Sequence, residues 1–247
     1  MARWNGKNPN IADSFVFHEE HPDSRQTEIK KPEIRDLLKI TKFKRNLIGS
    51  TLLWSCNAFN YYLLTFFLKY FPGNIFENSF FFALSDLVAF LSMGYLLKRT
   101  SLIKALYIAF AVDFAGGVLY ILFHQNIGLV PFLICICRGG VTLTFYTVYV
   151  SPKELFPTHY IATVYGQVNV FAHAVACLAP MVAEIPYPYP FIAYLVAVIV
   201  SALSNSMIKE ITDDDKELDF EELESLEKQK SDLIGEALID NSNKTTI

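Results

Sequence analysis

The sequence predicts an all-α protein that crosses a membrane six times. The chain has 247 residues, of which 52% are hydrophobic. Its charges are concentrated in residues 1–46 and 209–247, a distribution typical of a membrane protein with two water-exposed ends. The middle divides into six apolar runs, and about 20 helical residues suffice to cross a hydrocarbon core of about 30 Å. These spans are Leu47–Tyr70, Ile75–Leu97, Leu102–Phe123, Leu129–Val150, Tyr160–Ala183 and Phe191–Ile208.

The predicted domain boundaries follow the charges. Residues 1–46 form an N-terminal tail, which starts without a sustained period and is interpreted as mostly disordered. From Pro32 the tail alternates apolar and basic residues, as in an amphipathic helix that lies on an anionic membrane surface or is solvated beside it. Residues 47–208 form the six-helix domain. Residues 209–247 are acidic, which favours a solvated or partner-dependent tail.

The links between spans alternate in charge. Residues 71–74, 124–128 and 184–190 contain no lysine or arginine, whereas the link Lys98–Lys104 has three basic residues and residues 151–159 contain Lys153. Basic links favour the cytoplasmic side. We therefore expect both ends of the chain to be cytoplasmic, in the plasma membrane rather than an organelle. In the last basic link, Pro157 fits a short turn between antiparallel helices.

Four ionisable residues lie deep within the spans, where an unpaired charge costs several kcal/mol. Asp86 in the second span and Arg138 in the fourth are predicted either to line a substrate or proton site or to form a structural ion pair. Asp113 in the third span precedes a glycine pair at which helices can approach closely, so a structural role is favoured. His173 in the fifth span is either a hydrogen-bonded core residue or, if wetted, a proton sensor.

Several function classes have no support in the sequence. The cysteines lie in apolar stretches without metal-ligand spacing, so we expect buried thiols and neither a metal site nor a cofactor. The chain has no nucleophile elbow, phosphate loop or paired-carboxylate motif, and we predict no enzyme activity. A net charge of −4 argues against nucleic acid binding. A soluble helical protein is the remaining alternative, and extraction without detergent would identify it.

The link between the fourth and fifth spans has the run Glu154–Thr158, and Arg138 stands sixteen residues before Glu154. This pattern resembles the organic-ion transporter family of the major facilitator superfamily. That family has Glu-Leu-Phe/Tyr-Pro-Thr between its tenth and eleventh helices, matched by Glu154–Thr158, with an arginine sixteen residues earlier, matched by Arg138. Further matches run from Leu37 to Ile208. They include Trp54, Tyr61, Gly73-Asn74-Ile75-Phe76, Arg99, Gly166 and Ala179-Pro180.

The resemblance implies that the six spans are equivalent to helices seven to twelve, the C-terminal half of a major facilitator fold. It implies transport of a small organic ion by alternating access, with a lipid bilayer around the chain and a complementary six-helix half or a second copy opposite it. The implied gate residues are Arg99 and Glu154. The implied substrate-cavity residues are Trp54, Asn57, Tyr61, Asp86, Arg138, Phe145, Tyr146 and His173.

The chain departs from the family pattern at the cytoplasmic gate. The arginine expected three residues after the Pro-Thr threonine is Ile161, and one later glycine is Val164. The link Lys98–Leu102 lacks the acid, the glycine and the second arginine of the superfamily loop. His173 stands where cation carriers have aspartate and anion carriers have arginine, so the sign of the substrate stays open. These losses support an alternative, a non-transporting half-transporter that is a structural subunit of a membrane complex.

Overall fold

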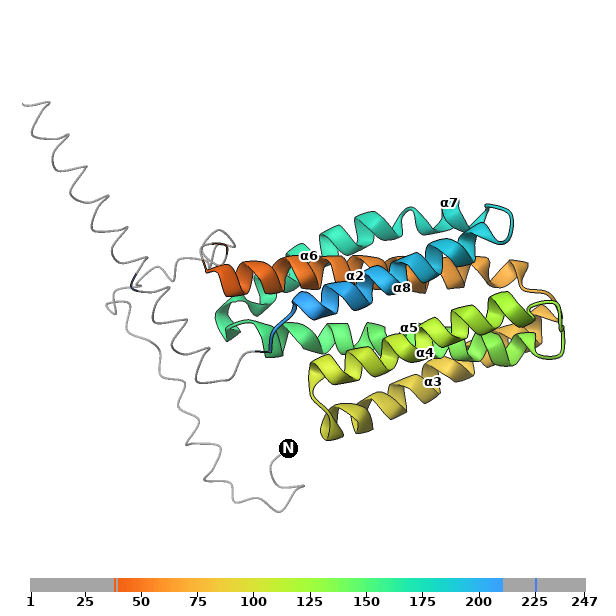
Figure 1. Ribbon diagram of the computed structural model, residues 1–247, viewed down its shortest axis with the longest axis horizontal. Coiled ribbons are helices and arrows are strands. Elements are labelled where there is room, and N and C mark those ends of the chain that lie inside the picture. The colour runs from red at the N-terminus through yellow and green to blue at the C-terminus, as the bar shows by residue number, and fades with distance from the viewer. Residues whose placement is uncertain (1–37, 39, 211–224, 226–247) are drawn as a thin grey trace, which may run out of the picture. The chain divides into compact units, whose positions relative to one another are not determined.

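The computed structural model describes Leu38, residues 40–210 and Ser225, and the described part of the chain forms long helices joined by short turns (Figure 1). The long helices are α2 (Thr41–Phe67), α3 (Ile75–Arg99), α4 (Leu102–Phe123), α5 (Val130–Leu155), α6 (Ile161–Ala176) and α8 (Tyr189–Met207). Shorter elements are η3 (Leu68–Tyr70), η4 (Thr158–Tyr160) and α7 (Ala179–Ala183). The predicted all-α, multi-pass membrane fold is confirmed.

Five of the six predicted spans are long and apolar enough to cross a membrane, among the described residues. They are α3, α4, α5, the combined segment Thr158–Ala183 and α8. Helix α2 has 27 residues, but it is not among the five because many of its positions are polar. Its asparagines and serines lie inside the bundle, where neighbouring helices can supply partners. Asn60, for example, donates a hydrogen bond to the carbonyl of Tyr194 on α8, at 3.2 Å.

Two boundaries differ from the prediction. Helix α2 begins at Thr41, so the expected limit at residue 47 lies inside a continuous helix. The rest of the predicted basic helix, residues 32–37 and 39, lies outside the described residues, as does the acidic tail except Lys209, Glu210 and Ser225. The fifth span is interrupted between Ala176 and Ala179. Pro180 has no N–H to donate to the Ala176 carbonyl, so the regular helical bonding cannot continue through this point.

Helices α2 and α5 are the central helices of the bundle. Helix α2 packs against α6, α7 and α8, and α5 packs against α3 and α4, while contacts of α2 with α5 and of α4 with α8 join the two groups. Exchanging the first three spans with the last three reproduces the same pattern of contacts. This is the arrangement expected of two structural repeats, which is common in membrane carriers.

Close contact between α4 and α5 depends on glycine. A Cβ atom built on Gly140 would lie 2.4 Å from the Cα of Asp113, and one built on Gly116 would lie 2.7 Å from the backbone nitrogen of Cys137. Small residues allow helix backbones to touch inside a membrane. The predicted close approach of helices near Asp113 is therefore confirmed.

The start of α2 and the end of α8 lie at the same end of the bundle. Asn46 donates to the carbonyl of Lys209 at 2.9 Å and accepts from the Lys209 amide at 3.0 Å. This reciprocal pair also satisfies backbone groups just beyond the end of α8. The same end of the bundle holds the α3–α4 turn and the end of α5 (Figure 1).

Candidate functional site

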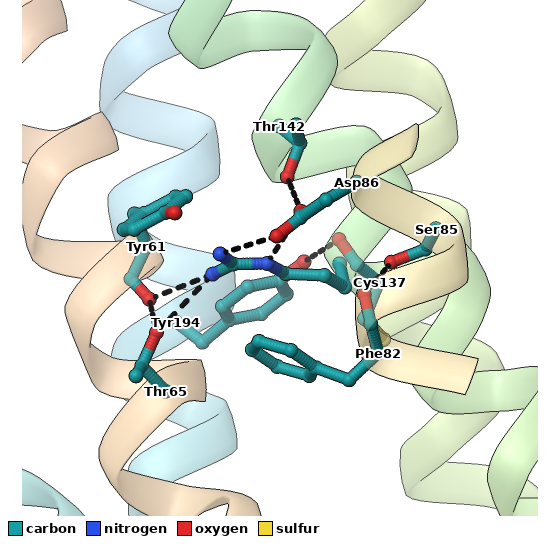
Figure 2. Close-up of polar contacts among 9 residues, drawn as sticks. Tyr61, Thr65, Phe82, Ser85, Asp86, Cys137, Thr142 and Tyr194 are labelled. Carbon is teal, nitrogen blue, oxygen red and sulfur yellow. Dashed lines mark hydrogen bonds and ion pairs between the residues drawn. The ribbon is translucent and has the colours of Figure 1, made fainter. Parts of the chain in front are cut away.

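Arg138 and Asp86 form an ion pair between α5 and α3. The Nε atom of Arg138 donates to one carboxylate oxygen of Asp86 at 2.8 Å, and Nη2 donates to the other at 3.0 Å (Figure 2). Thr142, one helical turn further along α5, donates its hydroxyl to the same carboxylate at 2.5 Å. A bidentate arginine–carboxylate pair is the strongest and most directional kind of charged hydrogen bond. Two of the predicted site residues are thus brought together.

The other donors of Arg138 reach α2. Its Nη1 atom donates to the carbonyl of Tyr61 and to the hydroxyl of Thr65, each at 3.2 Å. The guanidinium carbon lies 3.6 Å from the centre of the Tyr61 ring and 4.2 Å from that of Phe82. Both distances are within the range of cation–π attraction. Arg138 therefore ties together α2, α3 and α5.

The pair is buried unevenly. The Arg138 side chain is 2% exposed, whereas that of Asp86 is 32% exposed. A buried guanidinium needs a counter-charge and hydrogen-bond acceptors, and Arg138 has both. The exposed part of the pair is the edge of the Asp86 carboxylate. Arg138 balances its negative charge, so the pair has no net charge.

An aromatic wall continues from this pair along α2, α5 and α6. Phe145 stacks on Tyr61 with ring centres 4.7 Å apart and lies 4.9 Å from Tyr149. The ring of Trp54 lies 4.9 Å from Tyr149 and 5.1 Å from Tyr165, in edge-to-face geometry. Trp54 is buried, and the other rings are partly exposed. We call these five residues, together with Tyr62 beside Tyr61, the aromatic wall.

His173 extends the aromatic wall on α6. Its ring centre lies 6.2 Å from that of Tyr62. Both residues line a cavity of about 340 Å³, together with Cys177 and Pro180 at the break between α6 and α7. His173 is exposed, so the interpretation as a buried core histidine is wrong. Its ring lies on the surface that also carries the partly exposed rings of α2.

Two further predicted residues take no part in the ring contacts of the wall. The Tyr146 ring packs against Phe90 of α3, with ring centres 5.1 Å apart, and lines a separate cavity of about 450 Å³. Asn57 is buried in α2, and its amide nitrogen has no hydrogen-bond partner among the described residues. The structure therefore brings together six of the eight predicted cavity residues, whereas Tyr146 lines a separate cavity.

The predicted gate residues are at one end of the bundle but do not pair with each other. Arg99, the last residue of α3, lies over the ring of Tyr95, with 5.5 Å from its guanidinium carbon to the ring centre. Glu154 is exposed near the end of α5 and lines a cavity of about 380 Å³ with Thr100 and Glu210. No ion pair joins Arg99 to Glu154 in the described part of the chain.

Sequence reasoning missed several residues of the site. Thr65 and Thr142 complete the hydrogen bonds of the ion pair, and Tyr165 packs beside Tyr149 in the aromatic wall. A helical spacing signal existed for two of them. Thr65 follows Tyr61 by four residues and Thr142 follows Arg138 by four, so each lies on the same helix face as a predicted site residue.

Comparison with known proteins agrees with this architecture. The profile of the Major Facilitator Superfamily matches residues 11–180, more than half of the chain. The chain is also 32% identical over 134 residues to the human protein named organic cation/carnitine transporter 2. That match covers 51% of this chain and spans only 23% of the relative's length. The chain therefore belongs to the major facilitator superfamily.

Proposed function

We propose that this chain forms one wall of a transport pathway for a small organic ion. Three findings support the proposal: membership of the major facilitator superfamily, a multi-pass helical fold, and a partial relative named as an organic cation and carnitine transporter. The aromatic wall and the Arg138–Asp86 pair lie on helices from both structural repeats. Carriers of this architecture bind their substrate between such elements near the middle of the membrane.

The substrate that the site suits best is an organic cation or a zwitterion with a quaternary ammonium group. The observation that carries this choice is the complete pairing of Arg138 with Asp86, which leaves no free arginine charge to hold an anion. Aromatic faces attract quaternary ammonium groups, and several such rings together form a suitable site. Phe145, Tyr149 and Tyr62 offer partly exposed rings in one continuous array.

Transport by alternating access needs a second wall that moves against the first. We propose that a complementary six-helix half or a second copy of this chain supplies it. Arg99 and Glu154, on the same end of the bundle, act as gate residues in this scheme. That end also carries Lys42, Lys98 and Lys153, whereas the opposite turns carry few basic residues. By the positive-inside rule, this charge asymmetry supports a cytoplasmic location for that end.

Uptake into proteoliposomes tests the proposal. The full chain, alone and with candidate partner halves, is reconstituted and supplied with labelled tetraethylammonium, carnitine or a dicarboxylate. We expect uptake of tetraethylammonium or carnitine above that of protein-free liposomes, and no uptake of the dicarboxylate. Preference for the dicarboxylate would overturn the assignment of substrate charge. Absence of uptake with every partner would count against transport itself.

A second function is favoured by one observation at the gate. Arg99 packs on Tyr95 and forms no ion pair with any acid of the described residues, although ion pairs at this position normally lock the closed gate in the family that the chain resembles. A non-transporting subunit that holds a larger membrane complex together has no need of such a lock. Co-purification with other membrane proteins at fixed stoichiometry, with no binding of any organic ion, would support this second function.

A further inference from the structure

A second buried polar cluster lies where α4, α5 and α8 meet. Asp113 of α4 is 2% exposed and Tyr194 of α8 is 0% exposed. The Tyr194 hydroxyl donates to the Asp113 carboxylate. The same hydroxyl lies 3.3 Å from the Asp113 carbonyl oxygen. It also lies 3.5 Å from the Cys137 carbonyl oxygen (Figure 2). The proposed transport site makes no use of these groups.

The Asp113 carboxyl has no cation to balance a negative charge among the described residues. Arg138, a buried base on α5, has its charge balanced by Asp86 and its remaining donors taken by Tyr61 and Thr65. The titratable groups that face Asp113 are the Cys137 thiol from α5 and the Tyr194 phenol from α8, and both are uncharged near neutral pH. A carboxyl group in this position has a lower free energy as a neutral acid than as an unpaired anion.

We propose that Asp113, Tyr194 and the Cys137 carbonyl form a proton-binding site inside the membrane domain. Without a bound proton, the Asp113 carboxylate accepts a hydrogen bond from the Tyr194 hydroxyl. When the site takes up one proton from water, the charge of Asp113 changes from −1 to zero and its new O–H donates to the Tyr194 oxygen. The phenol proton then turns to the carbonyl of Cys137 or of Asp113. Both states keep every donor satisfied, as a buried polar cluster requires.

The proposed proton site adjoins Arg138 along α5. Cys137 and Arg138 are consecutive residues of α5, and the backbones of α4 and α5 touch at Gly140 and Gly116. These contacts place Asp113 directly against the backbone of the helix that carries the ion pair. The proposal concerns proton binding alone and stands whether or not the chain transports an organic ion.

Infrared spectroscopy of the full chain in lipid nanodiscs tests the proposal directly. A protonated carboxylic acid absorbs apart from a carboxylate, and surface acids are ionised at neutral pH. We expect the wild type to show a carboxylic acid signal at pH 7 that is lost in Asp113→Asn and kept in Asp86→Asn. A wild type without the signal, or an Asp113→Asn variant that retains it, would overturn the proposal.

A second variant covers the case in which Asp113→Asn does not fold. Tyr194→Phe removes the phenol that donates to the anion and accepts from the acid, so the carboxylic acid signal is expected to change frequency while remaining present. An unchanged frequency would show that the acid responsible for the signal does not contact Tyr194, and would refute the proposed site. Neither readout depends on substrate.

Discussion

At the residue scale, the ion pair between Arg138 and Asp86 is the central contact of the candidate site. The guanidinium is buried, and the carboxylate satisfies two of its nitrogens. Removing one member of a buried pair leaves the other charge without compensation, which costs more than removing both. This asymmetry separates a structural contribution of the pair from a contribution to substrate binding.

Asp86→Asn is expected to lower the free energy of unfolding by about 3 kcal/mol, because Arg138 then stays buried with a neutral partner. The double variant Asp86→Leu with Arg138→Met is expected to lie within about 1 kcal/mol of the wild type, since no charge is left inside the bundle. Chemical denaturation in detergent measures both. A double variant that is less stable than Asp86→Asn contradicts this interpretation.

An exposed ion pair lies at the end of the bundle away from Arg99 and Glu154. It allows a prediction about the effect of pH. Lys69 donates to Glu184 at 2.7 Å. Hydrogen bonds from Lys69 and then Tyr70 lower the pKa of Glu184, and the bond to Glu184 raises the pKa of Lys69. A carboxyl group with a lowered pKa stabilises the fold above its unfolded-state pKa, and this contribution is lost as pH falls through the folded-state pKa.

The wild type is therefore expected to melt slightly above Glu184→Gln at pH 7. The difference is expected to shrink as the pH falls below the ordinary glutamate pKa of about 4.3, and to vanish once the pH is below the lowered pKa of Glu184. The effect is small because both side chains are more than half exposed. Melting temperatures measured across this pH range at low salt provide the test. A difference that persists in acid would show that Glu184 acts through something other than its charge.

At the scale of elements, two features stand out: the close packing of α4 against α5, and the break between α6 and α7. The sequence predicted the glycine-mediated approach near Asp113, and it predicted all six helical segments. It did not predict the break after Ala176, because Pro180 is equally compatible with a mild kink. It also could not show which helix faces meet, since α2 and α5 carry polar residues on several sides. Thr65, Thr142 and Tyr165 were missed for that reason.

Two adjacent glycines of α5 provide a matched test of the packing. Gly140→Ala is expected to cost about 1–3 kcal/mol, because the new Cβ would lie 2.4 Å from the Cα of Asp113. A Cβ on Gly139 meets nothing within 4 Å, so Gly139→Ala is expected to be neutral or stabilising by up to about 1 kcal/mol. Thermal melting in detergent compares the two. Equal effects would mean that α4 and α5 do not touch as described.

The break between α6 and α7 exposes a thiol. Cys177 is the one exposed cysteine among the four of the chain and shares a cavity with His173 and Tyr62. A water-soluble maleimide is expected to label the wild type at this residue first, and Cys177→Ala is expected to lose most of the fast labelling. Tetraethylammonium is expected to slow the reaction. Fast labelling that survives in Cys177→Ala would contradict the placement of the break.

At the scale of the whole molecule, the fold class and family follow from long-range pattern, whereas the proposed class of substrate rests on local geometry. Six apolar runs with alternating link charges were enough to predict a multi-pass helical protein, because the bilayer sets the length of each run. The pairing of Asp86 with Arg138 was one of two possibilities left open by the sequence. Only the relative rotation of α3 and α5 decides that the two side chains meet.

Equilibrium binding of labelled tetraethylammonium to the full chain in nanodiscs tests the central claim, that the aromatic wall binds an organic cation. Phe145→Leu removes a ring from the wall, and Phe76→Leu is the matched control because Phe76 is 83% exposed on α3. We predict that Phe145→Leu weakens binding about fivefold, equivalent to about 1 kcal/mol of cation–π attraction, and that Phe76→Leu binds like the wild type. Equal affinities in the two variants would contradict the account.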